Sequence, residues 1–184
     1  FGVSVAAIAF LAAIGNMASG LIQLSYAALT RFISRRVILT VGGLVFGGGM
    51  VAHALAASFG PFSVANVLSR VGGSPQHPVG NGLIAEQFPP ERQGFAISAH
   101  IAGGNVGSVL VPLLGAALIV GIGWRWTMVA FGLPAVVIAV LFFLLVRETG
   151  ADRAAARAYG SLRSAMATVL RDRNLLLVYL SAAA

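Results

Sequence analysis

Residues 62–85 read FSVANVLSRVGGSPQHPVGNGLIA, an apolar stretch whose single charged residue is Arg70. Polar residues follow that arginine at Ser74, His77 and Asn81. Because the spacings are i, i+4, i+7 and i+11, the four side chains would share one face of a helix. An arginine at the centre of a membrane costs about 2.5–3.5 kcal/mol, so it normally faces a bundle interior or a water-filled path. The stretch therefore predicts a membrane helix that lines a polar path.

The whole chain has the composition of a membrane protein. Of its 184 residues, 58% are hydrophobic and 9% are charged, and the mean hydropathy is +0.92. In soluble domains about a quarter of the residues are charged. Five apolar stretches are long enough to cross about 30 Å of hydrocarbon as helices. We predict an all-α, polytopic membrane helical bundle with spans at 3–29, 37–57, 62–85, 94–119 and 126–146.

The sequence predicts three regions along the chain. Residues 1–147 hold the five transmembrane helices, 148–173 form a cytoplasmic linker, and 174–184 start a further transmembrane helix. Because the chain opens on Phe1 rather than Met and ends within an apolar run, we expect a piece of a longer protein. Five apolar residues of the linker are spaced as in an amphipathic helix, to which a flexible linker is the alternative. They are Leu162, Ala165, Met166, Val169 and Leu170.

The charged residues narrow the class of protein further. All twelve basic residues are arginines and there is no cysteine, so disulfides are excluded, and we predict no cofactor and no metal site. The net charge of +7 does not predict nucleic-acid binding, because the arginines cluster in alternate loops. By the positive-inside rule the loops 30–36, 86–93 and 148–173 are cytoplasmic, and Phe1 lies on the outer side.

Glycine and proline occur inside the predicted spans. Gly103 and Gly107 form a small-xxx-small pair, which is typical of close helix packing. Pro75 and Pro78 remove two backbone donors from the third span, and the resulting kink frees carbonyl groups that need partners. In membranes such a kink is tolerated where the helix packs against protein or lines a cavity.

A second stretch carries a family resemblance. Residues 26–36 read YAALTRFISRR, which is similar to the cytoplasmic gating motif G-x-L-A-D-R-x-G-R-R of the major facilitator superfamily. Arg31, Arg35 and Arg36 match the motif, whereas Thr30 stands at its acidic position. The resemblance covers essentially the whole chain, as the second to sixth helices of the family's amino-terminal half and the start of the seventh. It implies a secondary transporter with alternating access, in which these arginines belong to a gate.

The loop at 85–94, AEQFPPERQG, resembles the family's loop between the fourth and fifth helices. In the family such charges contact the gating motif. We therefore expect an ion pair between this loop and the arginines after the first span, with Glu86 and Arg92 as gate elements. Exposed pairs are worth under about 1 kcal/mol, so this hypothesis concerns gating rather than stability.

Two further strings resemble one branch of the superfamily, the fosmidomycin resistance carriers. They are GGSPQHPVGNGL at 72–83 and GGNVGSVLVPLLGAAL at 103–118. The second also resembles the family's antiporter motif and keeps Pro112, although Val111 stands where a glycine usually precedes the proline. The resemblance implies a proton-driven efflux carrier with phosphonate antibiotics such as fosmidomycin in its cargo range.

Arg70 and His77 are the leading candidates for the substrate or proton pathway. Arg70 is predicted either to anchor an anionic substrate or to be a buried tether, bonded to freed carbonyls or to Asn16 or Gln23. His77 is either a packing residue or a group that accepts and releases a proton in each cycle. Asn16 and Gln23 share a face of the first span at i, i+7. Other predicted lining residues are Ser74, Asn81 and Asn105, while His53 and His100 are expected near the membrane surfaces.

We predict a non-enzyme that exports a small molecule in exchange for protons across a bacterial inner membrane. An importer or uniporter of a small polar metabolite is the alternative. An intramembrane serine hydrolase using Ser74 and His77 is a remote one, because no G-x-S-x-G elbow is present. The expected partners are the lipid bilayer, the substrate, protons and the remaining helices of a full-length chain.

Overall fold

The computed structural model describes residues 1–148 and 171–172. Over residues 1–148 every regular element is a helix, which confirms the predicted all-α class. Three of the described helices, α1, α2 and α5, are long and apolar enough to cross a membrane. The bounds are α1 Val5–Leu29, α2 Arg35–Leu55, α3 Phe59–Gly73, α4 Pro78–Gln87 and α5 Pro90–Leu145. The predicted amphipathic helix at 162–170 and the further span at 174–184 lie outside the described residues.

Serine side chains fix the starts of the first two helices. Ser4 Oγ accepts a hydrogen bond from the backbone N–H of Ala7 at 3.2 Å, and Ser34 Oγ accepts one from Val37 at 3.3 Å. Each bond satisfies a backbone donor that has no partner within its own helix. The turn between α1 and α2 therefore ends at Ser34, within the string that resembles the gating motif.

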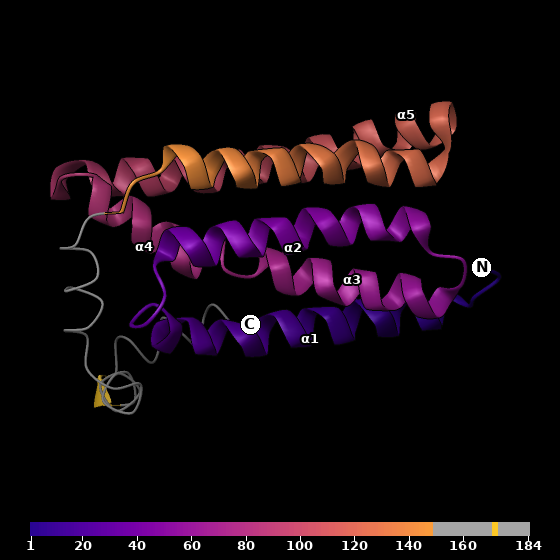
Figure 1. The fold of residues 1–184 in the computed structure, drawn as a ribbon, viewed down its shortest axis with the longest axis horizontal. Helices are drawn as coiled ribbons and strands as arrows, with labels where there is room; N and C mark the ends of the chain where they lie inside the picture. Colours follow the sequence, from indigo (N-terminus) through magenta and orange to yellow (C-terminus); the bar gives the residue numbers. More distant parts are fainter. Residues whose placement is uncertain (149–170, 173–184) are drawn as a thin grey trace.

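α5 contains two predicted spans. Gly123 has φ of +78°, a backbone conformation that favours glycine, and it interrupts the helical geometry between them. The chain reverses there, and the two halves of α5 lie side by side (Figure 1). Phe131 of the second half approaches Gly115 of the first, where an added Cβ atom would lie 3.7 Å from the phenyl ring. The loop expected near 120–125 is thus a tight break at one glycine.

The third predicted span is not one helix. α3 ends at Gly73 and α4 begins at Pro78, so the interruption expected from the prolines is a four-residue break. Pro75 is almost fully buried in this break, and its carbonyl accepts the N–H of Val79 at 2.9 Å. The four polar residues from Arg70 onward therefore do not form one uninterrupted helical face, because Ser74 and His77 lie in the break between the two helices.

α2 is the central helix, packed against both α3 and α5. Glycines permit both contacts. A Cβ atom added at Gly42 would lie 2.6 Å from the carbonyl oxygen of Gly72 on α3, and one added at Gly47 would lie 2.7 Å from that of Gly132 on α5. The backbones approach closely because no side chain separates them. A buried apolar cluster joins α1, α2 and α4, consisting of Tyr26, Ile38, Leu39, Val79 and Leu83.

The packing predicted for Gly103 and Gly107 is not found among the described residues. A Cβ atom at either position would meet no atom within 4 Å. Pro112 is exposed, and α5 continues through it as a helix. The glycines that do contact the backbone of a neighbouring helix lie on α2 and its partners, because α2 has neighbours on two sides.

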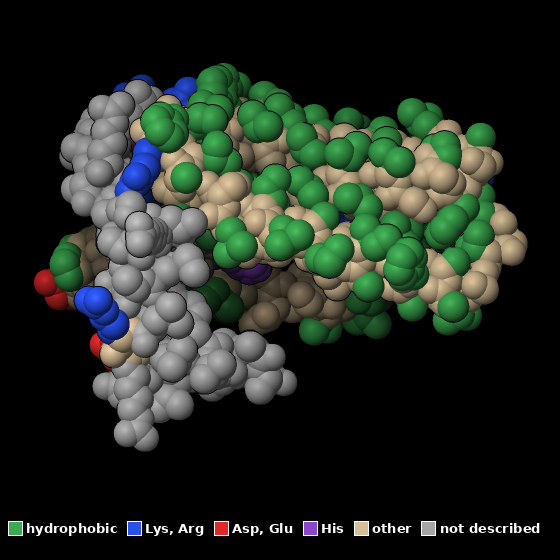
Figure 2. All heavy atoms as spheres, turned by 90° about the horizontal axis from the view of Figure 1, so that it is seen from below, with side chains coloured by type: hydrophobic (Ala, Val, Ile, Leu, Met, Phe, Trp, Pro, Cys, Tyr) green, Lys and Arg blue, Asp and Glu red, His purple; other side chains and the backbone are tan. Residues whose placement is uncertain are grey.

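The outer surface fits a membrane environment. Figure 2 shows hydrophobic side chains along the length of the molecule, with Arg, Asp and Glu gathered mainly at one end. The α1–α2 turn, the α4–α5 connection and the end of α5 all lie at that end (Figure 1). At the opposite end Arg125 donates to the carbonyl oxygens of Ala54 and Ala56, at 3.0 and 2.9 Å, and so satisfies the last turn of α2.

We expect Gly42→Ala in the full-length protein to lower the free energy of unfolding by about 1–3 kcal/mol, because the new methyl group forces α2 away from the backbone of α3. Gly48→Ala is the matched control on the same helix, since its methyl group would meet nothing within 4 Å. Denaturant unfolding in mixed micelles measures both. Equal stability of the two variants would contradict the close α2–α3 contact.

Candidate functional site

Arg70 is bound by two neutral amide side chains. Its Nε donates to Asn66 Oδ1 at 3.0 Å, and its Nη1 donates to Asn16 Oδ1 on α1 at 2.6 Å. Within residues 1–148 no carboxylate lies within ion-pair distance of the guanidinium. The contact with Asn16 is one of the alternative tethers predicted from the sequence, which also named freed carbonyls and Gln23. Since both partners are neutral, neither compensates the positive charge of the guanidinium.

Gly15 makes room for this arginine. A Cβ atom added at Gly15 would clash with Arg70 Cδ and lie 2.9 Å from its Nε. Gly15 is buried, and it immediately precedes the residue that accepts the hydrogen bond from Nη1. The stem of Arg70 therefore crosses α1 at a position without a side chain. Sequence analysis did not single out Gly15, because a glycine in an apolar span has no pattern of its own.

Ser74 also faces α1. Its Oγ donates to the carbonyl oxygen of Val71 at 2.6 Å, so the Tyr26 hydroxyl, 2.6 Å away, must donate to Ser74. Tyr26 is buried and occupies the position of the first glycine in the gating motif. Ser74 is likewise buried, with 5% of its surface exposed. Its hydroxyl is thus used to join α1 to the break between α3 and α4.

The other predicted pathway residues are not bonded to Arg70. His77 is exposed at the start of α4, while Asn105 and Gln23 are exposed on α5 and α1. Asn81 is half-buried, and its Oδ1 has no hydrogen-bond partner among the described residues. The structure therefore brings Arg70 and Asn16 together and leaves these four elsewhere.

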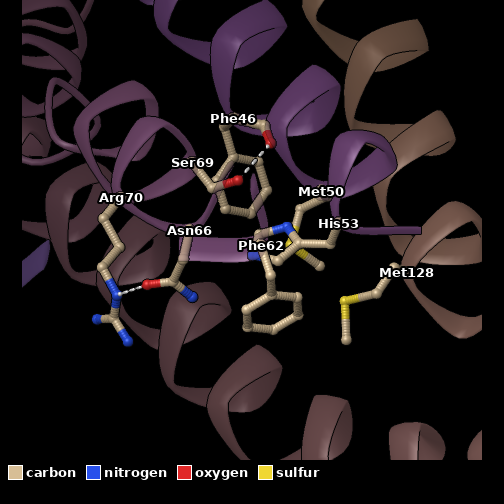
Figure 3. A pocket seen from close by; sticks show the side chains of 8 residues that line it. All are labelled: Phe46, Met50, His53, Phe62, Asn66, Ser69, Arg70 and Met128. Atoms are coloured by element: carbon tan, nitrogen blue, oxygen red, sulfur yellow. Dashed lines mark hydrogen bonds between the residues drawn. The ribbon is translucent and has the colours of Figure 1, made fainter. Parts of the chain in front are cut away.

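A pocket of about 350 Å³ lies between α2, α3 and the second half of α5, and Arg70 is part of its lining (Figure 3). Its residues follow helical spacing on two helices. They are Phe46, Met50 and His53 on α2, Phe62, Asn66, Ser69 and Arg70 on α3, and Met128 on α5. The pocket thus continues the Arg70 face toward the start of α3, whereas the predicted stripe ran the other way.

His53 was expected near a membrane surface, but it is 3% exposed and lines the pocket. Its Nδ1 lies 2.7 Å from the carbonyl oxygen of Gly49. A carbonyl only accepts hydrogen bonds, so Nδ1 carries the proton of this bond. The ring stands edge-on to Phe62 with the ring centres 4.6 Å apart. The i, i+4, i+7 spacing of Phe46, Met50 and His53 was the sequence signal that these residues share one face of α2.

Charged residues meet at the arginine-rich end. Arg35 at the start of α2 forms an ion pair with Glu86 of α4, as expected from the two loops. The backbone N–H groups of Arg35 and Arg36 donate to the two carboxylate oxygens of Glu148, at 3.1 and 3.4 Å. An acidic group there also interacts favourably with the positive end of the helix dipole. Glu148 therefore ties the first turn of α2 to the end of α5, a role that sequence analysis missed.

The remaining gate candidates differ in their contacts. The guanidinium of Arg36 donates to the carbonyl oxygen of Val146 at 3.2 Å and lies 4.2 Å from the ring centre of Phe143. Arg31 is half-buried in the turn after α1, and Arg92 is exposed in the first turn of α5. The acidic groups beside the start of α2 are thus on α4 and after α5, while the acidic position of the motif holds a threonine.

Comparison with known proteins identifies the family. The model of the Major Facilitator Superfamily matches residues 1–184, so the chain belongs to this superfamily. The multi-pass membrane fold follows from this match together with the apolar helices. The chain spans about a quarter of the length of the curated relatives that it matches.

Three relatives illustrate the range of the match. The efflux pump radE of Floropilus chiversii is 29% identical over 67% of this chain and 23% of its own length. The antiporter QDR3 of Candida albicans is 29% identical over 59% of this chain and 16% of its own length. A probable L-galactonate transporter of Escherichia coli is 22% identical over 80% of this chain and 32% of its own length.

We expect Gly15→Ala to cost about 1.5–3 kcal/mol of unfolding free energy, the range for a lost hydrogen bond to a charged group, because the methyl group displaces Arg70 from Asn16. Gly20→Ala on the same helix is the control, since its methyl group meets no atom within 4 Å. In an Arg70→Ala background the cost of Gly15→Ala should disappear. An unchanged cost in that background would show that Gly15 acts through another contact.

We expect Arg35→Gln and Glu86→Gln to be coupled by about 1 kcal/mol in a double-mutant cycle on unfolding free energy, since each removes one side of the same ion pair. The matched cycle pairs Arg35→Gln with Glu91→Gln, an exposed acid of the α4–α5 region. That second cycle should give no coupling. Equal coupling in both cycles would mean that only the general charge of this end matters.

Proposed function

We propose that this chain is part of a secondary active transporter that exports a small organic molecule in exchange for protons. The observation that carries the proposal is Arg70, a cation within an apolar helix whose partners are both neutral amides. Such a charge is costly in a membrane and is usually retained for a substrate or ion pathway. The names of two relatives, an efflux pump and an antiporter, support export and exchange.

Arg70 and His77 have different roles in this proposal. Arg70 attracts an anionic group of the substrate, and His77 takes up and releases the proton, since a histidine changes charge near neutral pH. The exposure of His77 supports its access to water. Apart from Glu86 near the end of α4 and Glu91 in the first turn of α5, the five described helices contain no acidic residue that would serve instead.

The proposed cycle is a rocking motion between two half-bundles about a site near the middle of the membrane. The arginine-rich end is assigned to the cytoplasm by the positive-inside rule. There the ion pair between Arg35 and Glu86 and the contacts of Glu148 would hold the gate elements of this half together. We assign the protein to a bacterial inner membrane, with support from the Escherichia coli relative.

Import or uniport of a polar metabolite is the second candidate, favoured by the printed substrate of that relative, L-galactonate. Serine hydrolysis has little support in the described residues. The Ser74 hydroxyl is bonded to Tyr26 and Val71, and no histidine accepts its proton there.

The proposal is tested with the full-length protein in everted membrane vesicles that hold an imposed pH gradient. Addition of a cargo molecule, fosmidomycin among those tried, should collapse the gradient. Arg70→Ala and His77→Asn should each slow this collapse at least tenfold, because one removes the substrate anchor and the other the proton carrier. His100→Asn, a histidine without an assigned role, is the matched control.

Two results would contradict the proposal. Collapse of the pH gradient at the normal rate in both Arg70→Ala and His77→Asn would place the site elsewhere. Uptake of L-galactonate without proton movement, in vesicles with correctly inserted protein, would favour metabolite import.

A further inference from the structure

The pocket between α2, α3 and the second half of α5 lies on the opposite side of Asn66 from the Arg70 guanidinium. Asn66 Oδ1 accepts a hydrogen bond from Arg70 Nε at 3.0 Å, and a Cβ atom added at Gly15 of α1 would lie 3.5 Å from the same oxygen. Arg70 Nη1 donates to Asn16, also on α1. Figure 3 shows the guanidinium pointing away from Phe62. The charge of Arg70 therefore faces α1, and the other lining residues decide what the pocket can bind.

Asn66 presents a hydrogen-bond donor to the pocket. A guanidinium only donates, so the atom of Asn66 that bonds Arg70 is the oxygen, and the NH2 group occupies the other branch of the carboxamide. In Figure 3 this nitrogen lies on the side of the Phe62 ring. It has no hydrogen-bond partner among the described residues. Asn66 thus connects Arg70 to the pocket, with its acceptor used and its donor free.

The rest of the lining is mostly apolar. Phe46 and Phe62 supply aromatic surfaces, and Met50 and Met128 supply flexible thioether side chains that adapt to aromatic rings. The hydroxyl of Ser69 is already used, because it donates to the carbonyl oxygen of Phe46 at 3.3 Å. The pocket has a volume of about 350 Å³, within the range of roughly 300–1,000 Å³ for small-molecule sites. An aromatic body therefore fits against these walls.

His53 offers one hydrogen-bond acceptor. Its Nδ1 donates to the carbonyl oxygen of Gly49 at 2.7 Å, so in the neutral ring Nε2 holds a lone pair. Among the described residues Nε2 has no hydrogen-bond partner. The side chain is buried, and its edge-on contact with Phe62 fixes the plane of the ring. The pocket therefore combines one free donor, on Asn66, with one free acceptor, on His53.

These two free atoms restrict the kind of ligand. A polar atom that stays unpaired in an apolar pocket costs free energy, so a ligand must offer an acceptor to Asn66 and a donor to His53. A carboxylate has no donor, and an ammonium group has no acceptor. A neutral carboxamide or lactam has both, on two atoms that lie side by side in one plane, and can thus reach partners on two helices.

We propose that this pocket binds a neutral aromatic amide, with its carbonyl oxygen on Asn66 Nδ2, its N–H group on His53 Nε2, and its ring system against Phe62 and Met128. The proposal goes beyond the proposed function, in which Arg70 attracts an anionic group, because this ligand is uncharged and does not contact the guanidinium. Binding in the pocket requires neither transport nor protons. Because Asn66 also accepts from Arg70, the bound amide would hold both side chains in their observed arrangement.

The test uses the full-length protein in lipid nanodiscs and isothermal titration calorimetry at about pH 8, where an imidazole is neutral, with heats from empty nanodiscs subtracted. Three probes have nearly the same shape: naphthalene-2-carboxamide, the ketone 2-acetylnaphthalene, which has no donor, and naphthalene-2-carboxylate, which has no donor and carries a charge. We expect the carboxamide to bind about tenfold more tightly than the ketone, because the ketone leaves His53 Nε2 unpaired. The carboxylate should bind most weakly of the three, because it also loses the hydration of its charge.

Each variant should remove one part of the recognition. His53→Phe should abolish the advantage of the carboxamide over the ketone, because no acceptor remains. Asn66→Asp keeps the shape of the side chain but places an oxygen where the NH2 group was, so it should weaken the ketone about tenfold. Met17→Ala, on the exposed side of α1, is the control and should change the binding of no probe. Thermal unfolding shows whether each variant is folded, and the comparison of the three probes in the unmodified protein depends on none of them.

Absence of saturable binding by the carboxamide would overturn the proposal, as would equal binding of the carboxamide and the ketone. An advantage of the carboxamide that survives in folded His53→Phe would also overturn it. If the carboxylate binds most tightly and loses this advantage in Arg70→Gln, the ligand reaches the guanidinium and the pocket does not select a neutral amide.

Discussion

The hydrogen bond between Arg70 and Asn16 is the contact on which the arrangement of the candidate site depends. An arginine in an apolar helix needs hydrogen-bond partners, because little water is available to solvate it. Asn66, one turn earlier on α3, supplies one partner, and α1 must lie close enough to supply the other. Gly15 permits that approach. The same contact therefore fixes both the position of α1 on α3 and the orientation of the guanidinium.

α2 links the proposed gate to the pocket. Near one end it carries His53 in the pocket, and at the other it carries Arg35 and Arg36 beside Glu86 and Glu148. At its glycines the backbone of α2 contacts α3 and α5 directly, so no flexible side chain lies between the helices to absorb a displacement. A shift of α2 at the charged end would thus also move the wall of the pocket. This gives the proposed gate a direct mechanical connection to the proposed binding site.

The membrane fold and the break near Gly123 could be predicted from the sequence, because apolar length and turn residues are local constraints. The Arg70–Asn16 contact was one of several alternatives that the cost of a buried charge left open. The burial of His53, the role of Gly15 and the capping of α2 by Glu148 could not be predicted. Each depends on how closely two helices approach, which spacing along one helix does not specify. The close packing of the glycine pair on α5 stays a prediction: small residues permit such packing, but among the described residues an added Cβ atom at either glycine would meet no neighbour.

The break at residues 74–77 changes how the polar stripe is interpreted. Arg70 and Ser74 are both bound to α1, whereas His77 lies between Pro75 and Pro78 and is exposed. The stripe is therefore two short polar faces joined by a bend, one held against α1 and one open. In the proposed exchanger Arg70, which binds the substrate, and His77, which carries the proton, would belong to different rigid segments. Coupling between them would then act through the bend, where the Tyr26–Ser74 hydrogen bond and buried Pro75 fix the angle.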